Sequence, residues 1–342
     1  MCARTRVYYK KMGDRGQTQL LFLPEIRKLN SMHLILPAPR ESFDIELEDG
    51  TKIKMRRHGN SGGARLLISH GNGFAVDAYL PFWHFLLPKY DVLVFDFRNH
   101  GQNIPTQPSH HNYAQFARDL DRILDAVHQR MGQKATVGIF HSMSARAAMK
   151  HAIEIGWKWD GLVLFDPPNV PPLGHPRYRP MQIFEGMLRQ WALNRRRQFA
   201  TVEELADEYR RARAHRGWVG GAHELMARSV LRANPGGNGY SLVCAPENEA
   251  AIYAEALSLN LWPQACEFGG PVKLIGADPD MEGASPTGQT NRALAGENGY
   301  DYDFVPGTGH LLQIEKPDAC ARLVEDFLAK HGLQRKFSRL LK

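Results

Sequence analysis

Short apolar runs alternate along the chain with longer stretches that have the spacing of amphipathic helices. Six apolar runs predict buried strands: 65–69, 90–97, 136–140, 161–166, 271–278 and 302–307. Residues 112–131 place Phe116, Leu120, Ile123, Leu124 and Val127 on one face of a predicted helix. Shorter helices are expected over 77–88, from 143 to about 155, and over 316–331. This alternation predicts an α/β fold, with a mostly parallel central sheet and helices on both faces.

The pattern changes at two places. Residues 42–59 contain two alternating runs around Asp49 and Gly50, which predicts a β-hairpin. About 100 residues between the fourth and fifth runs show no strand pattern, although they are rich in apolar and aromatic side chains. We expect an inserted helical cap there rather than a linker. The predicted division is a core of 32–166 and 268–334, interrupted by a cap of 167–267.

The two ends of the chain are basic, whereas its body carries a small negative charge. The net charge is +7, of which residues 1–31 contribute +5 and residues 335–342 contribute +4, so the body carries −2. Basic residues confined to tails are typical of solvated ends and argue against a nucleic-acid-binding protein. We expect residues 1–31 to be a disordered extension, or to precede a true start at Met32, and 335–342 to be a basic tail.

Cysteine use and hydropathy indicate the compartment. Cys2, Cys244, Cys266 and Cys320 lie far apart and form no C-x-x-C pair, which argues against a metal or redox framework. Reduced thiols fit a cytoplasmic protein. The apolar runs are too short for a membrane span, and no secretory signal is evident. We therefore expect a cytoplasmic protein without stable membrane insertion.

Reactive side chains follow several of the predicted strands. "HGNGF", "FRNHGQN" and "HSMS" each follow a strand, as do Asp166 and Asp278, and His310 follows the last strand. The carboxyl ends of parallel strands meet at one edge of a sheet, so we expect these groups to converge. A serine, a histidine and an acid are the set that nucleophilic acyl transfer requires.

These motifs, in this order, resemble those of the α/β-hydrolase superfamily, in its serine esterase and lipase-like branch. "HGNGF" is similar to the HG-x motif, "FDFRNHGQN" to D-x-R-G-H-G-x-S, and "FHSMS" to the G-x-S-x-G nucleophile elbow. "LIGADPD" lies where the family has its acid, and "VPGTGHLLQIEKP" resembles its histidine segment. The resemblance covers about residues 43–166 and 268–331. It implies no metal ion and no organic cofactor.

The resemblance also implies roles for individual residues. Ser142 would be the nucleophile and His310 the base, with Asp278 as the acid that orients it. Asp166 remains an alternative for the acid, because some members of the superfamily place it one strand earlier, and so does Asp280, two residues beyond Asp278. Ser144 is the rival to Ser142.

Two backbone N–H groups would form the oxyanion hole. The resemblance implies those of Met143 and Asn72, with Gly73 as an alternative to Asn72. It assigns His70 and His100 to loop bracing, His141 is expected to be structural, and no H-E-x-x-H spacing supports a metal site among them. Phe140 departs from the family pattern, which has a small residue at this place in the elbow.

The sequence thus predicts a serine hydrolase that cleaves carboxylic esters of small or medium size. The cap contributes aromatic residues that suit an apolar acyl or aryl group, although many are expected to pack within the cap itself: Phe184, Trp191, Phe199, Tyr209, Trp218, Tyr240, Tyr253 and Trp262. Hydrolysis of thioesters, amides, lactones or carbon–carbon bonds, and acyl transfer, remain open. A non-catalytic ligand-binding protein of the same fold is the alternative from another class, and Phe140 is the residue that favours it.

Overall fold

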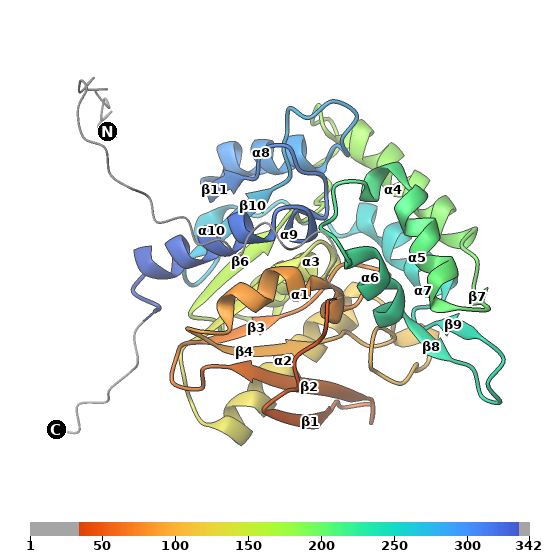
Figure 1. Ribbon diagram of the computed structural model, residues 1–342. Coiled ribbons are helices and arrows are strands. Elements are labelled where there is room, and N and C mark those ends of the chain that lie inside the picture. Colours follow the sequence, from red (N-terminus) through yellow and green to blue (C-terminus); the bar gives the residue numbers. More distant parts are fainter. Residues whose placement is uncertain (1–33, 335–342) are drawn as a thin grey trace, which may run out of the picture.

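The computed structural model describes residues 34–334 (Figure 1). The expected N-terminal extension, 1–31, and the basic tail, 335–342, lie outside the described residues. Eight strands form one sheet: β1 (Glu41–Glu46), β2 (Lys52–Gly59), β3 (Arg65–Ile68), β4 (Asp91–Phe95), β5 (Thr136–His141), β6 (Gly161–Phe165), β10 (Val272–Gly276) and β11 (Asp301–Phe304). Their order across the sheet is β1-β2-β4-β3-β5-β6-β10-β11.

The sheet is mostly parallel, as the sequence predicts. From β4 to β11 every neighbouring pair of strands is parallel, whereas β1 pairs antiparallel with β2, and β2 with β4. The expected hairpin around Asp49 and Gly50 is the β1–β2 pair, and Gly50 has the positive φ of +78° that its turn requires. All six expected strands are present, and five of them are buried, whereas β11 is a partly exposed strand at the edge of the sheet.

Helices cover both faces of the sheet. One face packs α1 (Leu80–Trp83) and α10 (Pro317–Lys330) against strand side chains that include Leu66 and Val137. The other face packs α2 (Tyr113–Met131), α3 (Met143–Lys150) and α8 (Thr287–Asn298) against side chains that include Leu67 and Leu162. Successive residues such as Leu66 and Leu67 point to opposite faces, so each strand contributes to both layers of the core. The predicted α/β fold is confirmed.

One expected helix is not continuous. Residues 77–88 form a 3₁₀ turn, Val76–Tyr79, then the four-residue α1, then a second turn, His84–Leu86. Pro81 lies in the first turn of α1 and has no N–H to give to a helix that begins earlier. The expected helix is therefore present as consecutive 3₁₀ and α turns and not as one α-helix.

The segment between β6 and β10 is mainly helical. It contains α4 (Tyr178–Leu193), α5 (Val202–Arg211), α6 (Ala222–Val230) and α7 (Pro246–Glu255), which gather beside the sheet in Figure 1. We call residues 167–267 the cap. It also holds a small antiparallel sheet that the sequence pattern did not indicate, of β7 (Gln198–Phe199), β9 (Tyr240–Leu242) and β8 (Leu231–Ala233). Strands of two or three residues are too short to give a recognisable alternation.

Candidate active site

His310 contacts both a serine and a carboxylate. It lies in the loop between β11 and the short helix α9 (Leu312–Glu315). Its Nε2 lies 2.9 Å from Ser142 Oγ, and its Nδ1 lies 2.6 Å from Asp166 Oδ2. Three segments that are far apart in the sequence thus meet at the carboxyl edge of the sheet. The expected pairing of Ser142 with His310 is present in the geometry.

Ser142 lies in a tight turn between β5 and α3. Its backbone angles are φ +55° and ψ −113°, a conformation that a residue with a side chain rarely adopts. Its N–H donates to the carbonyl of Phe165 on β6, and its own carbonyl accepts from Arg146 in α3. The strand and the helix therefore hold the turn from both sides and maintain the strained conformation of the serine at the tip of the elbow.

Phe140 is accommodated by a glycine two residues earlier. Side chains at 138 and 140 point to the same face of β5. A Cβ on Gly138 would lie 2.4 Å from the Phe140 ring and 2.7 Å from the Leu162 side chain, so the ring fills the space that a larger residue at 138 would occupy. Phe140 is fully buried and packs edge-on against Trp159. The glycine at 138 thus makes room for the Phe140 ring beside the elbow.

Asp166 directly follows β6 and is completely buried. Its Oδ2 accepts from His310 Nδ1 and from Thr287 Oγ1, and its Oδ1 accepts from Ala277 N–H and Asn291 Nδ2. Burial by itself would raise the pKa of Asp166. The hydrogen bond and charge of His310, with the bonds from Thr287 and Ala277, outweigh burial and hold the pKa below its ordinary value. Asp166 is thus an ionised carboxylate facing the imidazole.

The prediction that Asp278 orients His310 does not match this geometry. The Asp278 carboxylate accepts the N–H groups of Gly307, at 2.6 Å, and of Asp280, at 2.9 Å. These backbone hydrogen bonds lower its pKa. Asp278 therefore holds the loop three residues before His310 and does not contact the ring. The other alternative, Asp280, is exposed and pairs with Arg292.

The side chain of Ser144 is occupied elsewhere. Its Oγ lies 2.9 Å from both the N–H and the carbonyl oxygen of His141, accepting from the first and donating to the second. It is fully buried in the first turn of α3. The geometry therefore makes it a brace of the elbow, not the partner of a histidine base.

Neither of the two expected oxyanion N–H groups, those of Asn72 and Met143, donates to an acceptor within residues 34–334. The alternative donor, Gly73, gives its N–H to His100 Nε2 at 3.2 Å. The Asn72 side chain donates to the Glu249 carbonyl in α7. This arrangement favours Asn72 over Gly73 as the second donor.

One buried ion pair connects the cap with this site and a second lies within the cap, and sequence analysis missed both. Arg146, one turn after Ser142, pairs with Glu185 of α4 at 2.6 Å, while Arg195 pairs with Glu249. Each charged side chain is at most 7% exposed. Arg195 is the first of three consecutive arginines. Its side chain is buried in the cap, whereas those of Arg196 and Arg197 are exposed, and the sequence does not show this difference.

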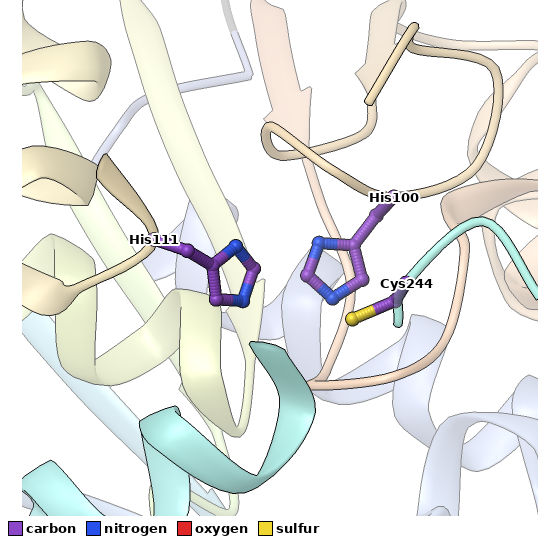
Figure 2. Close-up of side chains that lie close together, drawn as sticks. All are labelled: His100, His111 and Cys244. Carbon is purple, nitrogen blue, oxygen red and sulfur yellow. The ribbon is translucent and has the colours of Figure 1, made fainter. Parts of the chain in front are cut away.

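One cluster of three potential metal ligands lies beside the loop of Gly73. Within residues 34–334, His100, His111 and Cys244 bring their ligand atoms within 4.8 Å of one another, and all three are buried. Figure 2 shows the two imidazole rings facing each other, with the Cys244 sulfur beside the His100 ring. The cluster joins the loop after β4, the start of α2 and the cap.

Hydrogen bonding around the cluster disfavours a metal ion. The N–H of Thr106 donates to Asn99 Oδ1 at 2.6 Å, so Asn99 Nδ2 faces His111 Nδ1, which accepts. A neutral His111 then carries its proton on Nε2, the atom that faces the cluster. His100 Nε2 already accepts the N–H of Gly73. His111 Nε2 has no hydrogen-bond partner among the described residues, but its proton and the occupied His100 Nε2 leave the cluster without two free nitrogen ligands.

An open hollow of about 620 Å³ lies on the cap, away from the strand ends. Thr201, Glu224, Arg228 and Tyr240 are among its lining residues, and it includes no residue of the Ser142, Asp166 and His310 group.

With this geometry in place, the family can be assigned. A family model described as "Alpha/beta hydrolase family" matches residues 66–323. The chain belongs to the alpha/beta hydrolase family. The match spans β3 to α10 and includes the elbow, Asp166 and His310. No curated protein matches this alpha/beta hydrolase in sequence.

Solved structures share the fold at low sequence identity. E-2-(acetamidomethylene)succinate hydrolase aligns with a TM-score of 0.68 and 15% identity, over 84% of this chain and 99% of its own. The thioesterase domain of the curacin biosynthetic pathway gives 0.62 and 18%, over 83% and 98%. A bromoperoxidase from Bacillus anthracis gives 0.61 and 13%, over 84% and 100%. At these identities the likeness concerns the fold alone.

None of the helices in the described part of this alpha/beta hydrolase is long and apolar enough to cross a membrane.

Proposed function

We propose that this protein is a serine hydrolase in which Ser142 is the nucleophile, His310 the base and Asp166 the acid. The observation that carries the proposal is the His310 ring, which lies between Ser142 Oγ at 2.9 Å and Asp166 Oδ2 at 2.6 Å. A serine hydroxyl is a poor nucleophile until a base accepts its proton, and an ionised carboxylate fixes the tautomer in which Nε2 is that base.

In the acylation step, Ser142 Oγ forms a bond to the substrate carbonyl carbon and its proton passes to His310 Nε2. The carbonyl oxygen becomes an oxyanion, which receives the N–H groups of Asn72 and Met143. Collapse breaks the bond to the leaving group, and His310 Nε2 returns the proton to it. Asp166 stays ionised throughout and stabilises the imidazolium.

In the deacylation step, water gives a proton to His310 Nε2 and attacks the acyl carbon. The tetrahedral intermediate collapses, Ser142 Oγ leaves, and it recovers the proton from Nε2. No metal ion or organic cofactor enters this scheme. The same steps serve any acyl leaving group, so the reaction type follows from the triad and the substrate from the pocket.

We infer carboxylic esters of small or medium size as the substrate class, with thioesters and amides as alternatives. Two similar folds, by their names, hydrolyse E-2-(acetamidomethylene)succinate or act as a thioesterase. The buried Arg146–Glu185 pair links α3, one turn after Ser142, to α4 of the cap. Trp218 packs against Tyr209, within the cap itself.

A cytoplasmic location and small-molecule substrates, without nucleic acid, remain part of the proposal. Cys244, Cys266 and Cys320 form no disulfide, which supports a reducing compartment. The non-catalytic alternative rests on Phe140, and the packing of its ring over Gly138 supports the catalytic one.

A fluorophosphonate probe tests the proposal. We expect the intact mass to increase by one adduct and peptide mapping to place it on Ser142. The Ser142→Ala and His310→Ala variants should give none, whereas Ser144→Ala should still be labelled. A folded wild-type protein without an adduct would contradict an activated serine.

A further inference from the structure

His141, the residue before Ser142, links two loops of the site through a chain of hydrogen bonds. Its Nε2 lies 2.8 Å from the backbone carbonyl oxygen of His310. Its Nδ1 lies 2.7 Å from the hydroxyl of Tyr79, and that hydroxyl accepts the N–H of Gly71 at 3.1 Å. Both the His141 and Tyr79 side chains are completely buried.

The position of every proton in this chain follows from the partners. A carbonyl oxygen only accepts, so His141 Nε2 carries a proton. Burial lowers the pKa of His141 to about 3, so the ring is neutral and Nδ1 accepts. Tyr79 therefore donates its hydroxyl proton to Nδ1 and accepts from Gly71. Each donor and each acceptor is used once, and one tautomer satisfies all three bonds.

The chain ends at the groups that the proposed reaction needs. Gly71 directly precedes Asn72, the proposed oxyanion donor, and the other end is the main chain of His310 itself. Within residues 34–334, the carbonyl oxygen of His310 accepts a hydrogen bond only from His141. A Cβ on Gly71 would lie 2.9 Å from His141 Nδ1 and 3.2 Å from Ser142 Cβ, so this glycine permits the close approach.

We propose that His141 is a positioning residue, which sets the distance between the oxyanion loop and His310 by donating to the His310 carbonyl and accepting from Tyr79. The proposal rests on the proposed function. His141 does not touch the reacting atoms. Its effect is on the alignment of His310 Nε2 with Ser142 Oγ, and a displacement of about 1 Å in such an alignment lowers a rate by about 100-fold.

Two substitutions of similar size test the contacts of Nε2 and of Nδ1 separately. In His141→Gln the amide nitrogen reaches the place of Nε2 and keeps a donor for the His310 carbonyl. In His141→Asn the shorter amide reaches only the place of Nδ1, so the Tyr79 contact is kept and the donor to His310 is lost. His151 provides the matched control, because it is also a fully buried histidine, bonded to Asp121 and Trp159 outside the site.

The rate of fluorophosphonate labelling is the first measurement. We expect His141→Gln to stay within about fivefold of wild type and His141→Asn to be slower by about 100-fold. His151→Asn and His151→Gln should label at the wild-type rate, even where their melting temperatures fall. Equal rates for His141→Asn and His141→Gln would overturn the proposal, because ring size rather than the donor would then matter.

An NMR measurement tests the positioning role of His141 without an activity assay. We expect the downfield Nδ1–H resonance of His310, which reports its bond to Asp166, to remain in His141→Gln and to broaden or disappear in His141→Asn. An unchanged resonance in both variants would overturn the positioning role. If the wild-type protein is not labelled at all, the proposed function fails, and this resonance still tests whether His141 holds His310.

Discussion

Replacing Asp166 by asparagine tests which carboxylate orients His310. Asp166 has two sides. Oδ1 accepts from Ala277 N–H and Asn291 Nδ2, and Oδ2 accepts from Thr287 Oγ1 and His310 Nδ1. An asparagine must turn its NH₂ group toward one side.

The two orientations differ in cost. On the Oδ1 side the NH₂ group would face the main-chain N–H of Ala277, which cannot reverse, and the Asn291 amide, which would have to turn over. On the Oδ2 side it would face the Thr287 hydroxyl, which can rotate, and His310, which can change its tautomer. We therefore expect the NH₂ group to face His310, whose proton then moves to Nε2. In that tautomer Nε2 points an N–H at Ser142 Oγ and cannot act as a base.

The expected loss is large. A histidine held in the wrong tautomer costs about 10⁴-fold in rate, which corresponds to about 5.5 kcal/mol of transition-state stabilisation. Asp278→Asn is the matched control, because its amide oxygen can still accept the N–H of Gly307. We expect that variant to remain within about threefold of wild type, since neither a reacting group nor a buried charge is removed.

The assay is the second-order rate of fluorophosphonate labelling, with hydrolysis of p-nitrophenyl acetate as a second readout. Circular dichroism and thermal melting establish that each variant is folded. The reasoning would be refuted if a folded Asp166→Asn protein labelled at a rate near wild type while Asp278→Asn was strongly impaired. That result would return the acid to the position that the sequence alone suggested.

Three further predictions follow from the elbow and from the buried histidines. Ser144→Ala removes a hydroxyl that braces the His141 backbone, so unfolding in urea should show a loss of about 1 kcal/mol without loss of labelling; complete loss of labelling would instead make Ser144 the nucleophile. Burial lowers the pKa of His141 and His111 from 6.5 to about 3, so the stability that their neutral forms provide is present above pH 6.5 and is lost as the pH falls toward 3. Each histidine contributes up to about 1.4 kcal/mol per pH unit in that window, and the free energy of unfolding at pH 5 and pH 7 should differ less in His111→Gln than in wild type. Gly138→Ala places a methyl group against the Phe140 ring and should cost about 1–3 kcal/mol, of which Phe140→Leu in the same chain should restore a part; an unchanged midpoint in urea would show that the ring is not confined there.

The sequence by itself determined the sheet and the residues that gather at its edge. Apolar runs of strand length alternate with helical stretches, and that pattern is local, so it can be read without the tertiary structure. Ser142 and His310 each follow a predicted strand. Because parallel strands end on the same side of a sheet, the sequence predicts that the two residues lie at one edge. The β1–β2 hairpin was evident for the same reason, since its turn residues lie between two alternating runs.

The choice between Asp166 and Asp278 was decided only by the tertiary structure. Both follow a buried strand, and the sequence motif favoured Asp278. Asp166 faces the imidazole because donors from β10 and α8 converge on its buried carboxylate, whereas Asp278 turns to the N–H groups of its own loop. The Arg146–Glu185 pair and the link from His141 to the His310 carbonyl span 39 and 169 residues. A one-dimensional pattern does not show such contacts, because they depend on how the cap and the loops pack over the strand ends.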